Sequence, residues 1–154
     1  AETKLMGEIK IQETFNNFII LRMALLFGFG LWHSKNHYQQ MYMDLKNGKQ
    51  VKLFEDQYRT PISLRETARI FYELLDKNIT SEIINLGGIE RISRYEFGER
   101  LCEMTNFDKA LLVKIRMDDV PSLPKVEDVS MDTTKLQSFG IKQRNIEEMM
   151  YEIL

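Results

Sequence analysis

The chain has 154 residues, of which 44% are hydrophobic and 29% are charged, a composition typical of one globular domain with a moderate core. Its net charge of −2 provides no positive surface for nucleic acid or anionic membranes, so neither is an expected partner. The single cysteine, Cys102, excludes an internal disulfide and a cysteine-rich zinc module and fits a reducing, cytoplasmic compartment. The longest apolar run, residues 18–30, is too short to cross a membrane and contains Arg22.

The first two elements indicate a parallel α/β sheet. Leu5, Ile9 and Phe15 recur near helical spacing and predict a helix over residues 3–15. The next run is apolar at successive positions, so we expect a strand that is covered on both faces and ends at Gly28. We expect this strand to lie against parallel strands that these residues do not encode, or against a second copy. A helix followed by a covered strand is typical of the parallel α/β class.

Turn residues and capping motifs divide the rest of the chain. Ser63 with Glu66, and Ser93 with Glu96, have the capping-box spacing and precede predicted helices over residues 64–78 and 94–106. We also expect a helix over residues 36–49, a short helix, a turn and a closing helix over 133–154, and strands over 50–56, 81–88 and 109–117. The predicted loops are residues 29–38, 57–63 and 118–130.

Few residues indicate chemistry by themselves. His33 and His37 are four apart and could present two imidazoles to a metal, but no nearby residue completes a ligand set. A solvated loop is therefore favoured, and no metal is expected. Cys102 has no histidine near it in sequence to activate it, which favours a buried structural thiol. The acidic pairs at 118–119 and 127–128 lie in a polar loop, where solvated charge is the default.

Gly28 and Gly30 follow the covered strand, where ligands often approach the backbone in an open α/β sheet. No complete glycine-rich dinucleotide motif accompanies them. The residues alone therefore predict an α/β domain, or half of one, without a specific activity.

Five segments, taken in order, resemble one enzyme family. They are "TKLMGE", the strand with Arg22, "VKLFEDQYRTPIS", "IINLGGIERISRYEFGERLCEM" and "EDVSMDTTKL". This order resembles the C-terminal half of an extended short-chain dehydrogenase/reductase, and the dTDP-4-dehydrorhamnose reductases are the most similar group. The resemblance covers nearly the whole chain.

The resemblance implies an α/β fold, the C-terminal part of an NAD(P)-binding Rossmann-type reductase. Residues 1–30 would end the Rossmann-type domain with the catalytic-lysine helix and the strand after it. Residues 31–154 would be mainly a small α/β substrate-binding domain, with the option that a strand and a helix return to the Rossmann sheet. The glycine-rich half would be missing from these residues.

Lys4 matches the lysine of the family's Tyr-x-x-x-Lys motif, so the tyrosine would be the residue just before Ala1. In that motif the lysine lowers the pKa of the tyrosine and binds the nicotinamide ribose, while the tyrosine gives a proton to the carbonyl. The resemblance implies NADP or NAD as cofactor. Without the resemblance, Lys4 would be interpreted as a solvated helix lysine.

Further site residues follow from the same resemblance. Candidates near the nicotinamide and the sugar are Arg22, Met23, Ala24 and Leu25; an aromatic residue is usual near the Leu25 position, so the exact sugar stays open. Arg59 stands where glycine is common and could contact a diphosphate or pair with a surface carboxylate. Gln57 and Thr60 are candidates for substrate binding or for ordering the loop.

The implied function is part of an NAD(P)-dependent reductase of a 4-keto sugar nucleotide, with these residues inactive on their own. An alternative is a non-catalytic binding protein on the same scaffold, similar to the regulatory β subunit of methionine adenosyltransferase. A third hypothesis is an independent small α/β domain. The expected partners are the nucleotide-sugar substrate, the N-terminal Rossmann half and, because bare sheet edges associate, a second copy in a homo-oligomer.

Overall fold

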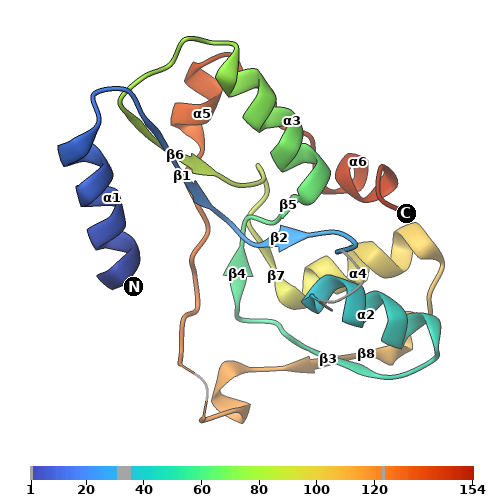
Figure 1. Ribbon diagram of the computed structural model, residues 1–154. Coiled ribbons are helices and arrows are strands. Elements are labelled where there is room, and N and C mark those ends of the chain that lie inside the picture. Colours follow the sequence, from blue (N-terminus) through green and yellow to red (C-terminus); the bar gives the residue numbers. More distant parts are fainter. Residues whose placement is uncertain (1, 31–35, 123) are drawn as a thin grey trace.

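The computed structural model describes residues 2–30, 36–122 and 124–154, which form a mixed α/β structure (Figure 1). Its α-helices are α1 (Glu2–Thr14), α2 (His37–Lys46), α3 (Leu64–Leu75), α4 (Arg94–Thr105), α5 (Thr134–Ser138) and α6 (Ile146–Tyr151). Short 3₁₀ helices are η1 (Lys109–Leu111) and η2 (Met117–Asp119). None of the described helices is long and apolar enough to cross a membrane.

The strands pair two by two. Parallel pairs join β1 (Ile19–Met23) to β6 (Glu82–Leu86), β2 (Leu26–Phe27) to β5 (Ile62–Ser63), and β3 (Val51–Phe54) to β8 (Leu112–Ile115). An antiparallel pair joins β4 (Tyr58–Arg59) to β7 (Ile92–Ser93). Parallel strands joined through helices confirm the predicted α/β class.

The two ends of the β1–β2 segment lie in different parts of the molecule. β1 and β6 lie in the upper part, with α1 on one side and α3 and α5 on the other (Figure 1). β2 lies in the lower part, together with α2, α4, β3 and β8 (Figure 1). Buried Ile84 in β6 and Phe27 in β2 belong to one hydrophobic cluster, so the core is continuous between the parts. The predicted domain division at residue 30 stays a prediction.

Helical spacing explains the buried helix faces. α2 buries Tyr38, Met41 and Leu45, which lie on one face because they are three and four residues apart. On α4, Gly98 lets the helix approach β3, since a Cβ there would lie 2.4 Å from Leu53 Cδ1. The small residue therefore sets how closely α4 packs on the strand.

The two predicted capping boxes have different outcomes. The Glu96 N–H donates to Ser93 Oγ at 3.1 Å, and the Ser93 N–H donates to the Glu96 carboxylate at 2.7 Å, which confirms this box. Ser63 caps α3 by accepting from the Glu66 N–H at 3.0 Å. The other half of that box was predicted wrongly, because the Glu66 carboxylate binds two arginines instead of the Ser63 N–H.

We expect Ser93→Ala to lower the free energy of unfolding by about 1 kcal/mol, because it leaves an N–H of the first turn of α4 without an acceptor. Urea denaturation measures this change. Ser138→Ala, at the exposed end of α5, is the matched control and should change stability by less than about 0.5 kcal/mol. Equal effects of the two substitutions would contradict a specific capping role.

Three other expectations differ from the structure. Residues 57–63, predicted to be a loop, contain the short strands β4 and β5. The strand predicted over 109–117 begins only at Leu112, after η1. β1 pairs in parallel with β6 of the same chain, so the expectation that its neighbours lie elsewhere was wrong for that edge.

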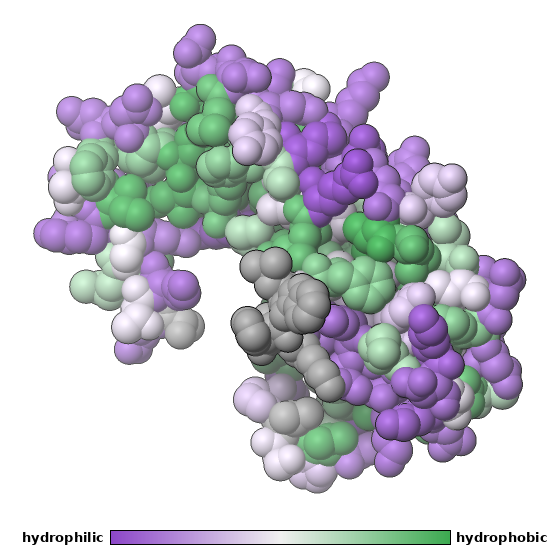
Figure 2. Space-filling model, turned by 45° about the vertical axis from the view of Figure 1, so that its right-hand side comes forward, coloured by the Kyte–Doolittle hydropathy of each residue, from purple (hydrophilic) through white to green (hydrophobic). Residues whose placement is uncertain are grey.

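The N-terminal helix and β1 are largely exposed. α1 has no buried residue, and Leu5, Met6 and Phe15 are each more than half exposed. Figure 2 shows α1 projecting from the body, beside hydrophobic surface of the upper part. In β1 only Ile20 is buried, and the edge opposite β6 has no strand partner among the described residues. The described residues therefore do not cover both faces of β1 as predicted.

Candidate functional site

The carboxyl ends of β1 and β6 meet the loop that carries Thr60. The Ala24 N–H donates to the carbonyl of the last residue of β6 at 2.9 Å, which extends the pairing beyond β1. The Ile62 N–H donates to Leu25 O, and the Gly88 N–H donates to Thr60 O, both at 3.0 Å. The structure thus brings together the predicted residues Ala24, Leu25 and Thr60. We name this place the strand-end corner; ligands bind at such strand ends in open α/β sheets.

Glycines make the strand-end corner close-packed. A Cβ on Gly87 would lie 2.8 Å from Thr60 Oγ1 and 3.1 Å from Ala24 Cβ. A Cβ on Gly88 would lie 2.2 Å from Pro61 O, a distance that no real structure tolerates without a backbone shift. Thr60 is only 4% exposed, so its side chain packs the corner and orders the loop.

Arg22 joins β1 to α1. Its Nε and Nη2 donate to the two carboxylate oxygens of Glu8 at 3.0 and 2.7 Å. This hydrogen bonding raises the pKa of Arg22 and lowers the pKa of Glu8. Lys4 is exposed and lies four residues before Glu8, so the two share the helix face that meets β1. Lys4 and Arg22 therefore belong to the same side of the α1–β1 junction.

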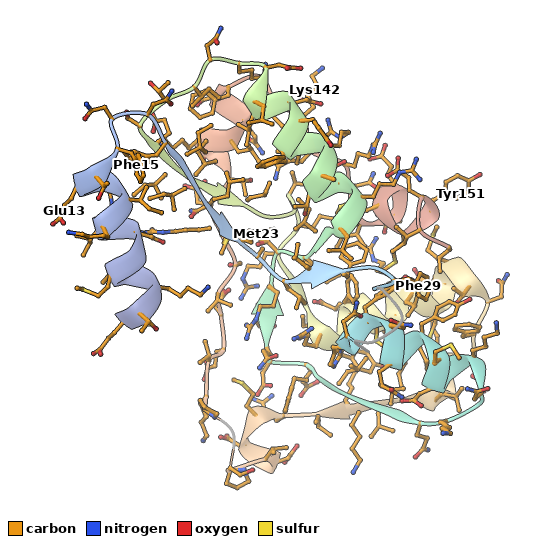
Figure 3. All side chains as sticks on the ribbon, in the orientation of Figure 1. Glu13, Phe15, Met23, Phe29, Lys142 and Tyr151 are labelled. Carbon is orange, nitrogen blue, oxygen red and sulfur yellow. The ribbon has the colours of Figure 1, made fainter. Side chains whose placement is uncertain are left out.

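Beyond Arg22 the chain leads from the end of β1 to the turn after β2. Met23, at the end of β1, is 42% exposed (Figure 3). After β2, Phe29 packs edge to face on Tyr42 of α2, with ring centroids 5.0 Å apart. Asn36 caps α2 and donates through Nδ2 to Gly28 O at 2.8 Å. The turn after β2 is therefore tied directly to the N-terminus of α2.

Arg59 lies in β4 and contacts backbone oxygens. Its Nη1 donates to Tyr58 O at 2.5 Å, and its Nη2 donates to Val126 O at 3.3 Å. Desolvation lowers the pKa of Arg59, while the charge of Asp128 acts in the opposite direction. These contacts place Arg59 between β4 and the C-terminal part of the chain. Within the described ranges Arg59 forms no ion pair with a carboxylate. This disfavours the expectation that Arg59 pairs with a surface carboxylate.

Gln57 links the segment before β4 to the start of α4. Its Oε1 accepts from Arg94 Nε at 3.2 Å, and its backbone O accepts from the Arg94 N–H at 3.1 Å. Its Nε2 donates to Met117 Sδ at 3.7 Å. Gln57 therefore orders the loop and holds the arginine that begins α4.

The C-terminal segment, residues 126–146, runs back over the strand-end corner. The Tyr58 N–H donates to Glu127 O at 2.7 Å, which starts a parallel bridge beside β4. The Met131 N–H donates to Thr60 Oγ1 at 3.2 Å, and Asn85 Nδ2 donates to the Asp132 carbonyl at 3.0 Å. This segment thus contacts both the loop and β6 close to the strand-end corner.

Asp128 holds this segment through a specific ion pair. Arg91 Nε donates to the Asp128 carboxylate at 2.8 Å, and the Arg91 guanidinium lies 3.6 Å from the centroid of the Tyr58 ring. Hydrogen bonds from Ser130 and Arg91 lower the pKa of Asp128 to about 2. Asp128 stays exposed, as the expectation of solvated charge requires, and forms this ion pair at the surface.

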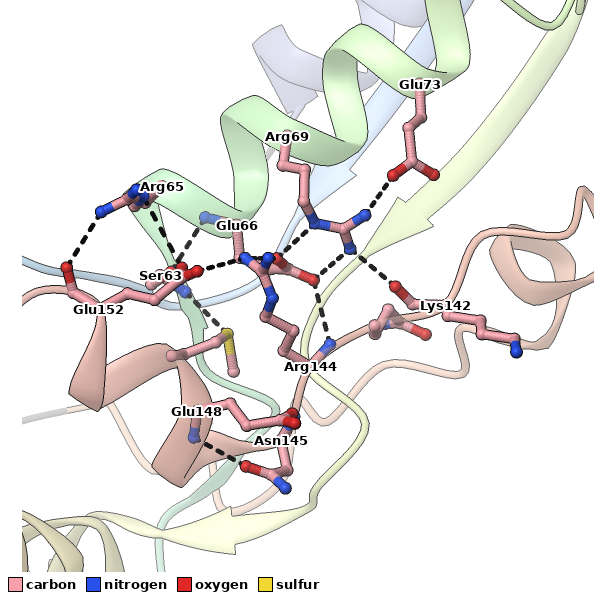
Figure 4. Close-up of polar contacts among 12 residues, drawn as sticks. Ser63, Arg65, Glu66, Arg69, Glu73, Lys142, Arg144, Asn145, Glu148 and Glu152 are labelled. Carbon is pink, nitrogen blue, oxygen red and sulfur yellow. Dashed lines mark hydrogen bonds and ion pairs between the residues drawn. The ribbon is translucent and has the colours of Figure 1, made fainter.

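A buried carboxylate ties α3 to the C-terminal segment (Figure 4). Glu66 is fully buried and accepts from Arg69 Nη2 at 2.5 Å, from the Arg144 N–H at 3.0 Å and from Arg144 Nη1 at 3.2 Å. Burial alone would raise the pKa of Glu66, but the hydrogen bonds from Arg69 and Arg144 outweigh it and lower the pKa below its ordinary value. Glu66 lies three residues after Ser63 of β5, so this network fixes α3 beside the corner.

A protein-family model, the RmlD substrate binding domain, matches the chain over residues 1–154. The chain belongs to this family. The match confirms the resemblance to the dTDP-4-dehydrorhamnose reductase group that the five sequence segments predict.

Two curated proteins are similar to this chain, and both are longer than it. Methionine adenosyltransferase 2 subunit beta from Xenopus laevis is 23% identical over 149 residues, which are 94% of this chain and 45% of that protein. Probable low-salt glycan biosynthesis reductase Agl14 from Haloferax volcanii is 28% identical over 130 residues, which are 78% of this chain and 40% of that protein. The chain thus spans less than half the length of these relatives.

Solved structures share the fold of this RmlD-family chain. A dTDP-4-dehydrorhamnose reductase from Bacillus anthracis, in complex with NADP, matches with a TM-score of 0.86 at 16% identity, over 99% of this chain and 53% of that one. The corresponding protein from Clostridium acetobutylicum matches with a TM-score of 0.83 at 21% identity, again over 99% and 53%. The fold is therefore that of the C-terminal region of Rossmann-type NAD(P)-binding reductases.

The remaining candidates are the two histidines and Cys102. His33 lies outside the described residues, and His37 begins α2. No group of three or more metal-binding side chains occurs in the part of this RmlD-family chain that the structure describes. Cys102 is 1% exposed, and burial raises the pKa of its thiol, which confirms the predicted structural role.

Sequence reasoning missed Arg94, which Gln57 holds through the Arg94 Nε and backbone N–H. The capping box at Ser93 predicts that α4 starts at Arg94, but it carries no information on what the Arg94 side chain meets. The pairing of β4 with β7 places Arg94 opposite Gln57, and because residues 57–63 were predicted to be a loop, no sequence signal pointed to this contact.

Proposed function

We propose that this chain is the substrate-binding half of an NAD(P)-dependent reductase of a 4-keto sugar nucleotide, similar to dTDP-4-dehydrorhamnose reductase. The observation that carries the proposal is the family match over residues 1–154, joined to the convergence of Ala24, Leu25 and Thr60 at the strand-end corner. Named relatives include reductases, one of them in complex with NADP. The described chain would be inactive alone, because the dinucleotide-binding half would lie in other residues.

The residues present fit the nicotinamide end of such a cofactor. Lys4 is exposed on the α1 face that meets β1, and Met23 is exposed at the end of that strand. Bound NADPH or NADH would supply the hydride. Lys4 would contact the nicotinamide ribose and lower the pKa of a tyrosine four residues before it, which would protonate the substrate oxygen. Arg59 would face the substrate diphosphate, and Gln57 and Thr60 would hold its loop.

The dinucleotide-binding half would pack against β1 and α1. β1 has a parallel partner on one edge only, within the described ranges. A groove of about 530 Å³ beside it is lined by apolar residues of β1 and α3, among them Leu21, Phe71 and Leu75. A further parallel strand with its helix would cover both features, as parallel sheets require. The same exposed edge supports the alternative expectation of a homo-oligomer in the isolated chain.

The proposal is tested with the longer protein that contains this chain. Oxidation of NADPH and of NADH is followed with dTDP-4-dehydrorhamnose and with other 4-keto sugar nucleotides. Turnover is expected, and Lys4→Met should lower kcat/KM on the order of 100-fold, because the tyrosine loses the charge that activates it. Lys10→Met, on the same helix, is the matched control and should leave the rate unchanged. If the residue four positions before Lys4 is not tyrosine, this mechanism is wrong.

A second candidate is a non-catalytic binding protein on the same scaffold. The similarity to methionine adenosyltransferase 2 subunit beta over 94% of this chain favours this alternative. The non-catalytic alternative is supported if the longer protein binds NADPH but turns over none of the 4-keto sugar nucleotides. Robust turnover of any of these sugar nucleotides contradicts the alternative.

A further inference from the structure

Glu8 differs from the rest of α1 in its contacts. Every other residue from Glu2 to Thr14 is exposed, whereas Glu8 is partly buried at the junction with β1. Arg22 donates to both oxygens of the Glu8 carboxylate, from Nε at 3.0 Å and from Nη2 at 2.7 Å. This bidentate geometry uses the planar fork of the guanidinium on a single carboxylate. The negative charge of Glu8 is therefore neutralised by a residue of β1, not by its own helix.

Lys4 lies one helical turn before Glu8 on the same face of α1. A lysine and a glutamate four residues apart on a helix attract each other when both are charged. α1 and β1 run in opposite directions (Figure 1), so the turn from Glu8 back to Lys4 leads toward the carboxyl end of β1. The Lys4 ammonium group thus has two alternative surroundings: the Glu8 carboxylate, or the space near the strand-end corner.

The two lysines of α1 differ in their ion pairs. Lys10 pairs with Glu13 at 3.2 Å, and both side chains are exposed. Lys4 forms no ion pair within 4.0 Å in the described ranges, although Glu8 lies at the spacing that allows one. The residues outside those ranges include no aspartate or glutamate. The charge of Lys4 is therefore left unpaired while Arg22 occupies Glu8.

A free Glu8 carboxylate would oppose the role of Lys4 in the proposed reaction. Its negative charge would offset the positive potential of Lys4, and a nearby positive charge is what lowers the pKa of a tyrosine. It would also draw the flexible lysine side chain away from the nicotinamide ribose. An arginine that occupies this carboxylate removes both effects.

We propose that Arg22 is a positioning residue, which binds Glu8 and thereby keeps the Lys4 ammonium group available to the cofactor and the tyrosine. Arg22 thus acts beside the nicotinamide indirectly, through the charge of Lys4. The catalytic consequence rests on the proposed function. The charge relation among the three side chains does not, and it is testable without turnover.

The first test measures the reactivity of Lys4 in the longer protein that contains this chain, without cofactor. Mass spectrometry follows the rate at which acetic anhydride acetylates Lys4 at neutral pH. Arg22→Gln should lower this rate about twofold, because the freed carboxylate of Glu8 holds Lys4 in its protonated, unreactive form. Arg22→Gln combined with Glu8→Gln should restore the wild-type rate. Lys10 is the internal control, and its rate should stay the same in every variant.

The second test compares kcat for a sugar nucleotide that the wild-type longer protein reduces. Arg22→Gln should lower kcat about threefold with unchanged KM for the sugar nucleotide, because Glu8 then competes for Lys4. The double variant should recover most of this loss, and Glu8→Gln alone should lose less than Arg22→Gln. Glu13→Gln removes the carboxylate that pairs with Lys10, and this matched control should behave like wild type.

Circular dichroism establishes that each variant is folded. Equal losses in Arg22→Gln, Glu8→Gln and the double variant would mean that the ion pair only fastens α1 to β1, and they overturn the inference. If Lys4 acetylation changes as expected but the longer protein reduces no sugar nucleotide, the charge relation stands and the proposed reductase activity fails. Reductase activity with no recovery in the double variant removes the inference and leaves the activity.

Discussion

Glu66→Gln should lower the free energy of unfolding by about 3 kcal/mol, one of the two largest effects that we expect in this protein. Glu66 is fully buried and pairs with Arg69 and Arg144. Its replacement by a neutral amide leaves two guanidinium groups without their shared counter-charge, and breaking one side of a buried pair typically costs about 3–5 kcal/mol. The lower end applies because both arginines reach solvent. Urea denaturation gives the value.

Glu73→Gln is the matched control. Glu73 also pairs with Arg69, but its side chain is 40% exposed. Exposed pairs contribute at most about 1 kcal/mol, so we expect a change below that limit. If Glu66→Gln costs no more than Glu73→Gln, the buried network does not fasten the C-terminal segment to α3.

The same carboxylate predicts a pH dependence. The pKa of Glu66 lies below its ordinary value of 4.5 in the folded chain. Ionised Glu66 therefore stabilises the folded state fully above pH 4.5, and this stabilisation decreases as the pH falls through the folded-state pKa. Wild type should lose more stability than Glu66→Gln between pH 6 and pH 3. Parallel stability curves for the two proteins would contradict this assignment.

Gly88→Ala should destabilise the chain by about 3 kcal/mol, because the added Cβ would lie 2.2 Å from the backbone oxygen of Pro61. The loop at residues 60–61 and the end of β6 must then move apart. This movement also displaces Thr60, which packs against Gly87 in the strand-end corner. Thermal or urea unfolding measures the loss of stability.

Gly7→Ala is a control with the same chemistry and the opposite expected sign. No atom lies within 4 Å of a Cβ at Gly7, which is in the exposed helix α1. The two substitutions change the entropy of the unfolded chain equally, so their difference reports the folded state alone. Gly7→Ala should leave stability unchanged or raise it by up to about 1 kcal/mol. A similar loss in both variants would show that crowding at Gly88 is not the cause.

Local signals in the sequence predicted the helices well. The caps at Ser63 and Ser93 and the apolar spacing of residues such as Tyr38, Met41 and Leu45 act within a few residues. The predicted hydrogen bond from the Ser63 N–H to the Glu66 carboxylate does not form, because a distant residue competes for that carboxylate. The Glu66 carboxylate is bound by Arg144, 78 residues later, and no local pattern predicts that competition.

The candidate site also contains residues that the sequence predicted and residues that it did not. Ala24, Leu25 and Thr60 were predicted through the family resemblance, and the structure brings them to one corner. Arg94 was missed because its side chain bonds to Gln57, 37 residues earlier, and no local pattern predicts that contact. Arg59 could be singled out, but its bonds to the carbonyl oxygens at 58 and 126 depend on a segment far along the chain.

The C-terminal segment gives this chain an order of assembly. Its contacts with Thr60 and Glu66 come from residues 71 and 78 positions further along the chain. The loop with Arg59 and the end of β6 are therefore synthesised well before the segment that holds them. Such distant contacts form slowly, and nascent chains fold from the N-terminal side first. A chain stopped before Asp128 would lack the contacts from Met131 to Thr60 and from Arg144 to Glu66, so its strand-end corner would stay incomplete.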